Sequence, residues 1–371
     1  MSPKTNILLI GATGHIGGSV LLRFLERSDA ASLSITTITR SSEKAGKLRT
    51  LGVNVVVGSY SDFPLLEKLA SEADVIIDIG DSDDLPAARA TLRGTEKRFK
   101  ATGVAPILIH TSGTGVLSDN AAGMYAYETI YDDANPEQIE TLAPTQFHRN
   151  IDLELINADK QGYVKTYLVI PSMIYGIASG RLVELGIQNR QSFQIPLLIC
   201  MSLDRGQGGM VGEGKNLWPN VHIDDVADLY VVLYDAIISN PATGHGREGI
   251  YFAENGEISL YDVGVAISKV LVELGRGKSA EPTPFTEEEV DKYFAGIPYF
   301  GSNSRCVATR SRSIGWQPTR TTADLFASIK PETEDLLKQS IDDWIQQARQ
   351  RLVTALDLNV VAALVEPVSA P

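Results

Sequence analysis

Short strand-like runs alternate with helical segments through roughly the first 110 residues of the chain. The strand-like runs lie at residues 6–10, 33–39, 53–57, 74–79 and 106–110. Between them, apolar residues recur at helical spacing, as Ile16, Val20 and Phe24 do at i, i+4 and i+8. This alternation predicts an α/β fold, a Rossmann-type doubly wound parallel sheet with helices on both faces and right-handed crossovers. The valine-rich run at 53–57 further predicts a central strand that is buried on two sides.

A glycine-rich loop follows the first strand. The chain reads Gly11-Ala12-Thr13-Gly14-His15-Ile16-Gly17, and the first helix comes directly after it. Gly11 permits a tight turn, Gly14 lets a pyrophosphate approach the backbone, and Gly17 allows the helix to pack on the strand. Free N–H groups at the helix N-terminus then hold the anion. Because the loop lies at the first βα junction, we predict that it binds a dinucleotide through Gly11, Thr13, Gly14, His15, Ile16 and Gly17.

The end of the second strand-like run bears on the choice of cofactor. An acidic residue at this position binds the ribose 2′-hydroxyl of NAD, whereas a basic residue accommodates the 2′-phosphate of NADP. The chain has Arg40 here, in Thr39-Arg40-Ser41-Ser42, and no acid. A guanidinium offers a planar fork that suits a phosphate. The sequence therefore predicts NADP(H) in preference to NAD(H), the alternative being that Arg40 is an ordinary solvated side chain.

The second half of the chain is less regular. Helical patterns at 148–160, 221–238, 259–274 and 286–294 are joined by strand-like runs at 164–170 and 249–252. Residues 176–220 are glycine-rich and irregular, apart from an apolar run at 193–201 that fits a pocket lining, a lid, the core or a subunit contact. We therefore expect a nucleotide-binding domain of residues 1–175 plus about 221–253. The expected smaller, mixed substrate-binding lobe is about 176–220 plus 254–345, and about 346–371 is expected to be a C-terminal tail.

The charge and the cysteine content exclude several classes of protein. Acidic side chains outnumber basic ones by 46 to 33, and the resulting net charge of −13 does not suit a protein that binds nucleic acid. The chain has no run of about 18 apolar residues that could span a membrane, and no N-terminal targeting segment. Its two cysteines form neither a disulfide framework nor a zinc motif, so no metal site is expected. We expect a cytoplasmic protein that binds a small-molecule substrate; a homodimer is compatible with these features.

Beyond the glycine loop, four further segments resemble the extended short-chain dehydrogenase/reductase superfamily, the epimerase/dehydratase group. They are Thr111-Ser112-Gly113, Val169-Ile170-Pro171-Ser172-Met173-Ile174-Tyr175-Gly176, Val221-His222-Ile223-Asp224-Asp225-Val226-Ala227 and Ile314-Gly315-Trp316-Gln317-Pro318. The resemblance implies that Ser112 is the serine that polarises the substrate carbonyl. It also implies that Pro171 and Ile174 contact the nicotinamide.

The chain departs from this superfamily at its catalytic pair, Tyr-x-x-x-Lys. No tyrosine between Ser112 and Pro171 is followed four residues later by a lysine. The helix that should carry the pair offers His148 instead, with Asp152 one turn further on to orient the imidazole. Tyr125 is a second candidate that could supply a phenol from another direction, and Ser112, His148 and Tyr125 are therefore the catalytic candidates.

Three functions are compatible with these observations. The first is an NADP(H)-dependent oxidoreductase or epimerase-like enzyme that acts on a small organic or sugar-like carbonyl or hydroxyl compound with non-standard acid/base residues. The second is an NmrA-like protein that senses the nucleotide without catalysis, which the missing Tyr-x-x-x-Lys pair favours. The third is a redox-neutral cyclase or isomerase on the same fold.

Overall fold

The computed structural model describes residues 4–355 and is built around a seven-stranded parallel sheet. The strand order is β11-β7-β5-β4-β1-β2-β3, and every neighbouring pair is parallel. The strands are β1 (Thr5–Ile10), β2 (Leu33–Thr39), β3 (Asn54–Val57), β4 (Val75–Asp78), β5 (Ile107–Thr111), β7 (Lys165–Pro171) and β11 (Ile250–Ala253). The Rossmann-type doubly wound sheet expected from the alternation of strands and helices is confirmed.

One prediction about this sheet is wrong. β3 is the edge strand and not a central one, and the Val57 side chain is 46% exposed. A continuous apolar run is compatible with burial on two faces but does not determine the order of the strands. The order of the strands depends on the side of β1 on which each βα unit packs. Three consecutive valines therefore did not justify a central position.

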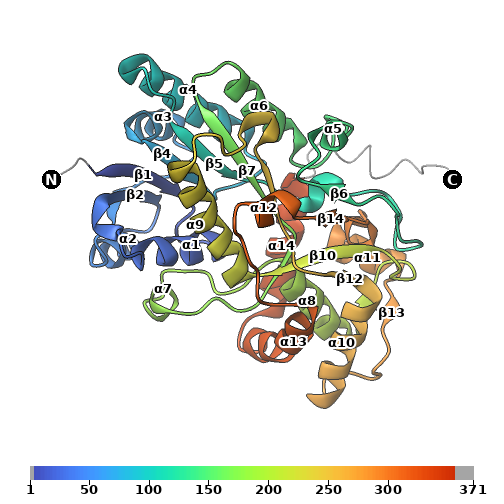
Figure 1. Cartoon of the computed structure of the whole chain (residues 1–371). Coiled ribbons are helices and arrows are strands. Elements are labelled where there is room, and N and C mark those ends of the chain that lie inside the picture. Colours follow the sequence, from blue (N-terminus) through green and yellow to red (C-terminus); the bar gives the residue numbers. More distant parts are fainter. Residues whose placement is uncertain (1–3, 356–371) are drawn as a thin grey trace.

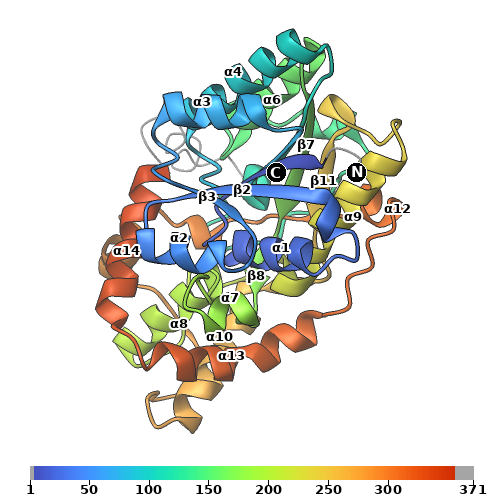
Figure 2. The same cartoon turned by 90° about the vertical axis from the view of Figure 1, so that its left-hand side faces the viewer.

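Helices cover both faces of the sheet, as Figure 2 shows. One face carries α3 (Phe63–Glu72), α4 (Leu85–Thr102) and α6 (Arg149–Lys160). The other carries α1 (His15–Leu25), α2 (Ser42–Arg49) and α9 (Ile223–Ser239). The predicted helix at 221–238 begins two residues later than expected, because Val221 and His222 end a strand, β10 (Leu217–His222). His222 then caps α9 by accepting a hydrogen bond from the backbone N–H of Asp224 (3.1 Å).

The buried apolar side chains form two clusters, of which the second belongs to a smaller lobe. This lobe contains a three-stranded mixed sheet in the order β12-β10-β8, with β8 (Met173–Tyr175) and β12 (Glu257–Ser259). Its helices include α8 (Gln194–Arg205), α10 (Leu260–Glu273), α11 (Glu287–Phe294), α13 (Thr322–Leu336) and α14 (Ile341–Ala355) (Figure 1). Shorter elements complete the fold: β6 (Tyr131–Asp132), α5 (Pro136–Ile139), α7 (Arg181–Glu184), β9 (Gly209–Met210), β13 (Thr283–Pro284), β14 (Cys306–Val307) and α12 (Thr309–Ser313).

The apolar run at 193–201 is core. Its residues from Ile195 to Met201 lie in α8 and are all buried, so of the four readings left open the packing one is correct. At the end of the chain, α14 continues to Ala355, with Ile345 and Ala348 buried against the lobe. Ordered structure therefore extends about ten residues past the expected start of a tail, and the rest of that segment, 356–371, lies outside the described residues.

Glu332 of α13 is a buried carboxyl that joins the lobe to the turn after β8. Its Oε1 accepts hydrogen bonds from the backbone N–H of Gly176 (3.0 Å) and from Ser328 Oγ (2.9 Å). Burial is the largest cause of the shift that raises the pKa of Glu332 to about 7. The native state therefore holds this proton above pH 4.5, where the unfolded chain releases it, and stability falls as pH rises.

We expect the Glu332→Gln variant to lack this pH dependence. Between about pH 4.5 and 7 the free energy of unfolding of the wild type should fall, relative to the variant, by roughly 3 kcal/mol. Urea unfolding at several pH values measures this difference. The control is Glu334→Gln, on the exposed side of the same helix. A constant difference between the wild type and Glu332→Gln across this range would contradict the prediction.

Candidate functional site

The glycine loop packs so closely that two of its glycines have no room for a side chain. Gly11 has a φ of +85°, and a Cβ there would lie 2.1 Å from the carbonyl oxygen of Ile79, directly after β4. A Cβ on Gly17 would lie 2.1 Å from the carbonyl oxygen of Gly11. The first helix can therefore approach the loop only because both residues are glycines.

The N-terminus of α1 is suited to an anion. Its N-cap is Gly14, which has no side chain to bond the first-turn N–H groups, and the first turn carries no acidic residue. Such a helix end presents uncapped donors and the positive end of the helix dipole. The loop therefore fits the pyrophosphate of a dinucleotide, as the sequence predicted for its backbone.

His15 belongs to the predicted cofactor loop, but its side chain is buried. Its side chain is 8% exposed, and burial lowers its pKa to about 4, so the imidazole is neutral. Its carbonyl accepts a hydrogen bond from Gln188 Nε2 (2.9 Å), and that of Thr13 accepts one from the backbone N–H of Asn189 (3.0 Å). Residues 188–191, which we call the strap, therefore lie across the start of α1.

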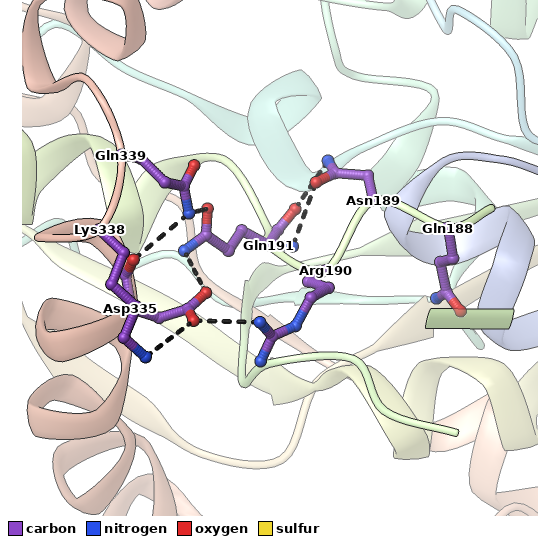
Figure 3. A pocket seen from close by; sticks show the side chains of 7 residues that line it. All are labelled: Gln188, Asn189, Arg190, Gln191, Asp335, Lys338 and Gln339. Atoms are coloured by element: carbon purple, nitrogen blue, oxygen red, sulfur yellow. Dashed lines mark hydrogen bonds and ion pairs between the residues drawn. The ribbon is translucent and has the colours of Figure 1, made fainter. Parts of the chain in front are cut away.

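The far side of the strap lines two adjoining cavities of about 370 and 430 Å³, which share Asn189, Gln191 and Gln339. Figure 3 shows the polar network of the first cavity. Asp335 accepts hydrogen bonds from Arg190 Nη1 (3.0 Å) and Gln191 Nε2 (3.2 Å), which ties the strap to α13. Neither cavity includes the glycine loop or His148, so the strap separates them from the predicted cofactor loop.

Arg40 follows the last residue of β2, where the sequence placed it. Its side chain is exposed, and among residues 4–355 it has no ion-pair partner. The following Ser41 is already engaged, because its hydroxyl caps α2 by accepting from the backbone N–H of Lys44 (3.2 Å). The Arg40 guanidinium is therefore free to meet a phosphate.

His148 lies at the N-terminus of α6 in a left-handed conformation, with a φ of +64°. A β-carbon makes this conformation costly by roughly 1 kcal/mol, so the surroundings must hold it. The ring Nδ1 lies 2.7 Å from Oδ1 of Asp83, in the loop after β4, and the ring packs edge-to-face on Phe147. Asp83 therefore fixes the ring and, by accepting from Nδ1–H, leaves Nε2 for chemistry.

The sequence suggested that Asp152 orients His148, but Asp152 does not bond the imidazole. Its side chain is 1% exposed and lies near Ser112 and His148. Burial raises the pKa of Asp152, while His148, His110 and the Ser112 hydroxyl act in the opposite direction. Although Asp152 is one helical turn from His148, Asp83 from the adjacent strand end is the residue that bonds the imidazole.

His110 of β5 adds a second histidine to this acidic surrounding. Its Nδ1 lies 3.4 Å from Oδ2 of Asp78. Burial acts to lower the pKa of His110, but the pairing with Asp78 and the charges of Asp152 and Asp83 outweigh it, so the pKa is raised. His110 lies within the sheet and has no role in the sequence-based prediction.

Two buried hydroxyls near the carboxyl ends of β5 and β7, those of Thr114 and Ser172, lack hydrogen-bond partners among residues 4–355. A third, that of Ser112, lies close enough to Asp152 to lower the pKa of that carboxyl. The backbone N–H of Ser112 donates to the Val169 carbonyl (2.9 Å), which fixes it beside β7. Pro171 ends β7, and half-buried Ile174 lies in β8 two residues after Ser172. Buried polar groups without partners are rare, and here they fit a polar ligand such as a carboxamide or carbonyl.

Tyr125 is not brought to this site by any hydrogen bond or ring contact among the described residues. Its carbonyl accepts from Asn303 Nδ2 (3.0 Å), in a segment that runs alongside residues 301–307. The phenol near His148 belongs instead to Tyr299, which sequence reasoning missed. Tyr299 lies far along the chain in a short apolar stretch with no motif, so no signal of spacing could have singled it out.

The comparisons with known proteins agree with this architecture. The NmrA-like family model matches residues 3–85. UDP-glucose 4-epimerase from Thermotoga maritima superposes with a TM-score of 0.59 at 15% identity, covering 90% of this chain and 99% of its own. dTDP-glucose 4,6-dehydratase from Bacillus anthracis, solved in complex with NAD, gives 0.57 at 16% identity, with 93% and 99% covered. The chain thus has the fold of these epimerases and dehydratases, and the fold that the motif resemblance implied is confirmed.

A curated relative extends over most of the chain. It is the oxidase ucsJ of Acremonium sp, 28% identical over 334 residues, which are 84% of this chain and 92% of that protein.

Within residues 4–355, no helix is both long enough and apolar enough to cross a membrane. The same residues contain no cluster of three or more histidine, cysteine or acidic side chains with the geometry of a metal site.

Proposed function

We propose that this protein is an NADP(H)-dependent oxidoreductase that interconverts a carbonyl and an alcohol, with His148 as the general acid/base. The observation that carries the proposal is the His148–Asp83 pair, which leaves ring Nε2 free 3.0 Å from the Cβ position of Gly113, the residue that follows Ser112. Two similarities support redox chemistry on this fold. The relative ucsJ is named an oxidase, and the structurally similar dehydratase was solved with bound NAD.

The cofactor residues proposed are those of the glycine loop, together with Arg40, Pro171 and Ile174. The N-terminus of α1 would bind the pyrophosphate, and Arg40 would bind the 2′-phosphate of NADP. When bound, the nicotinamide ring supplies or accepts the hydride. The rest of the chemistry falls to the protein: Ser112 bonds the substrate oxygen, and His148 Nε2 gives that oxygen its proton or removes it.

The pair replaces the missing Tyr-x-x-x-Lys by a different route. In the superfamily pattern a lysine assists a tyrosine, whereas here a carboxylate orients an imidazole. An imidazole can both give and accept a proton, and Asp83 orients this one through its Nδ1. With Asp83 in this role the mechanism does not need a lysine. The position one turn after His148 can therefore hold Asp152 instead.

The test of the proposal has two parts. Fluorescence titration with NADPH and NADH measures cofactor binding, and the loss of NADPH absorbance with a panel of aldehydes and ketones measures turnover. We expect tight NADPH binding and turnover with at least one member of the panel. Tight binding without turnover in either direction would instead support the nucleotide-sensing alternative, which the NmrA-like match at residues 3–85 also favours.

Replacing Arg40 tests the choice of cofactor. Arg40→Ala should weaken NADPH binding by about 10-fold or more and leave NADH binding unchanged, since a hydrogen bond between charged groups contributes roughly 1.5–3 kcal/mol. Arg49→Ala is the control, because Arg49 is an exposed arginine at the far end of α2, the helix that follows Arg40, and its guanidinium bonds the Val55 carbonyl (2.9 Å). Equal losses for both cofactors, or none for either, would refute the NADP preference.

A further inference from the structure

We infer that Tyr299 donates a hydrogen bond to the reacting oxygen of the substrate, which His148 also contacts. The oxygen would lie near Gly115, held by one donor from each lobe of the protein. This inference rests on the proposed function and extends it to a residue outside the superfamily's catalytic motifs. It also points to the substrate class, a neutral carbonyl compound with an apolar body.

The geometry at Gly115 brings the two side chains together. A Cβ built on Gly115 would lie 2.8 Å from Tyr299 Oη and 3.4 Å from His148 Nε2. Both polar atoms therefore face the side of Gly115 that carries no side chain, where Phe147 Cδ1 also lies 3.0 Å from the same Cβ position, and they are close enough together for one oxygen atom to contact both. Gly113 also lies close to this histidine: a Cβ built on Gly113 would lie 3.0 Å from His148 Nε2. Within residues 4–355 the Tyr299 hydroxyl forms no hydrogen bond, whereas the Tyr299 carbonyl accepts one from Ser302 Oγ (2.7 Å).

Aromatic packing fixes the Tyr299 ring. The ring is 9% exposed and lies 5.7 Å from the Phe147 ring and 5.6 Å from the Trp218 ring, centroid to centroid. Trp218 is itself held, because its indole N–H donates to the Ser302 carbonyl (2.6 Å). A donor that is already in place loses little freedom on binding substrate, which is what stabilisation of a developing negative charge requires.

The phenol acts by donating and does not act as a base. Burial, followed by the charge of Asp83, raises the pKa of Tyr299, so the hydroxyl keeps its proton. In the reductive direction, a hydride from NADPH forms the new C–H bond and the π electron pair of the carbonyl moves onto the oxygen. The imidazolium form of His148 then gives that oxygen its Nε2 proton and becomes the neutral imidazole, while Tyr299 stabilises the developing negative charge, so the products are the alcohol and NADP⁺.

The surroundings favour a neutral and apolar substrate. Asp83 and Asp152 lie close to His148, and Asp81 is partly buried in the same loop. This concentration of carboxylates disfavours an anion at the reacting centre. On the other side, the rings of Phe147 and Tyr299 offer apolar contact area.

The experiment compares Tyr299→Phe with the wild type, using the best ketone of the panel. We expect kcat to fall about 10- to 100-fold while the KM for NADPH stays unchanged, because only the substrate oxygen loses a donor. The control is Tyr293→Phe, which removes a hydroxyl bonded to Asp204 (2.5 Å) in the same cluster. Gly115→Ala, which places a methyl group 2.8 Å from Tyr299 Oη and 3.0 Å from Phe147 Cδ1, should displace the phenol and also lose turnover, and circular dichroism verifies that each variant is folded.

A second readout does not depend on turnover. Calorimetric titration of the ketone into protein saturated with NADP⁺, where no hydride is available, should show about 3- to 10-fold weaker binding to Tyr299→Phe. Unchanged kcat and unchanged ketone affinity in this variant would overturn the inference. If His148→Ala loses activity while Tyr299→Phe keeps it, only the role of Tyr299 fails. If the wild type neither binds nor turns over any carbonyl, the proposed function fails with it.

Discussion

We expect the His148→Ala variant to lose about 10²- to 10⁴-fold in kcat, the range that a positioned general acid contributes. The Nε2 atom would supply the proton, and its neighbour Asp83 holds the ring by a 2.7 Å contact to Nδ1. Asp83→Asn should lose less, because an amide can still accept from Nδ1–H but stabilises the imidazolium less well. Turnover of the best panel ketone, measured with saturating NADPH, gives both values.

The chain provides a matched control for this experiment. His245 forms a comparable pair with Asp159, its Nδ1 lying 2.8 Å from Oδ2, beside β7 and away from Ser112. His245→Ala should therefore leave kcat within about twofold of the wild type, by analogy with substitutions away from a catalytic site. NADPH titration of all three variants separates catalysis from cofactor binding. Full activity in His148→Ala would remove His148 from the mechanism.

The second large effect is expected at Gly17. In Gly17→Ala the new methyl carbon would lie 2.1 Å from the Gly11 carbonyl oxygen, a backbone atom that cannot move without shifting the loop. We expect a loss of several kcal/mol in the free energy of unfolding, in the upper range for single substitutions, and a loss of NADPH binding of at least about 100-fold. Urea unfolding and fluorescence titration measure the two effects.

Gly46 supplies the control for this prediction. It lies within α2, and a Cβ there would meet nothing within 4 Å. Gly46→Ala should stabilise the protein by roughly 0.5–1 kcal/mol, because alanine restricts the unfolded chain and favours the helix. If Gly17→Ala were as stable as the wild type and still bound NADPH, the role of the loop would have to be revised.

The sequence was most informative where local pattern and function coincide. The β1 strand, the glycine loop and the first helix could be predicted because Gly14 and Gly17 both pack against the Gly11 carbonyl within the same short loop. The capping box of α11, in which Thr286 and Glu289 bond each other's backbone N–H, is equally local, because the two residues lie three positions apart. His148 could be found because the motif it interrupts has a fixed place in the superfamily.

Contacts between distant segments could not be predicted. Asp83 pairs with a histidine 65 residues away, and Tyr299 reaches Gly115 from the other lobe. Neither pair has a spacing that a single sequence reveals, because the sheet order and the lobe packing create both. The edge position of β3 has the same cause, since strand order is a property of the whole sheet.

The most direct test of the central claim is to follow the hydride itself. NADPH carrying deuterium at C4, prepared in each of its two stereochemical forms, is incubated with the protein and the best carbonyl of the panel, and the product is analysed by mass spectrometry. An NADP(H)-dependent oxidoreductase transfers deuterium from one of the two forms to the carbinol carbon of the alcohol. Deuterium that stays on the nicotinamide in both forms, while the substrate is converted to an isomer or left unchanged, would contradict the proposed function.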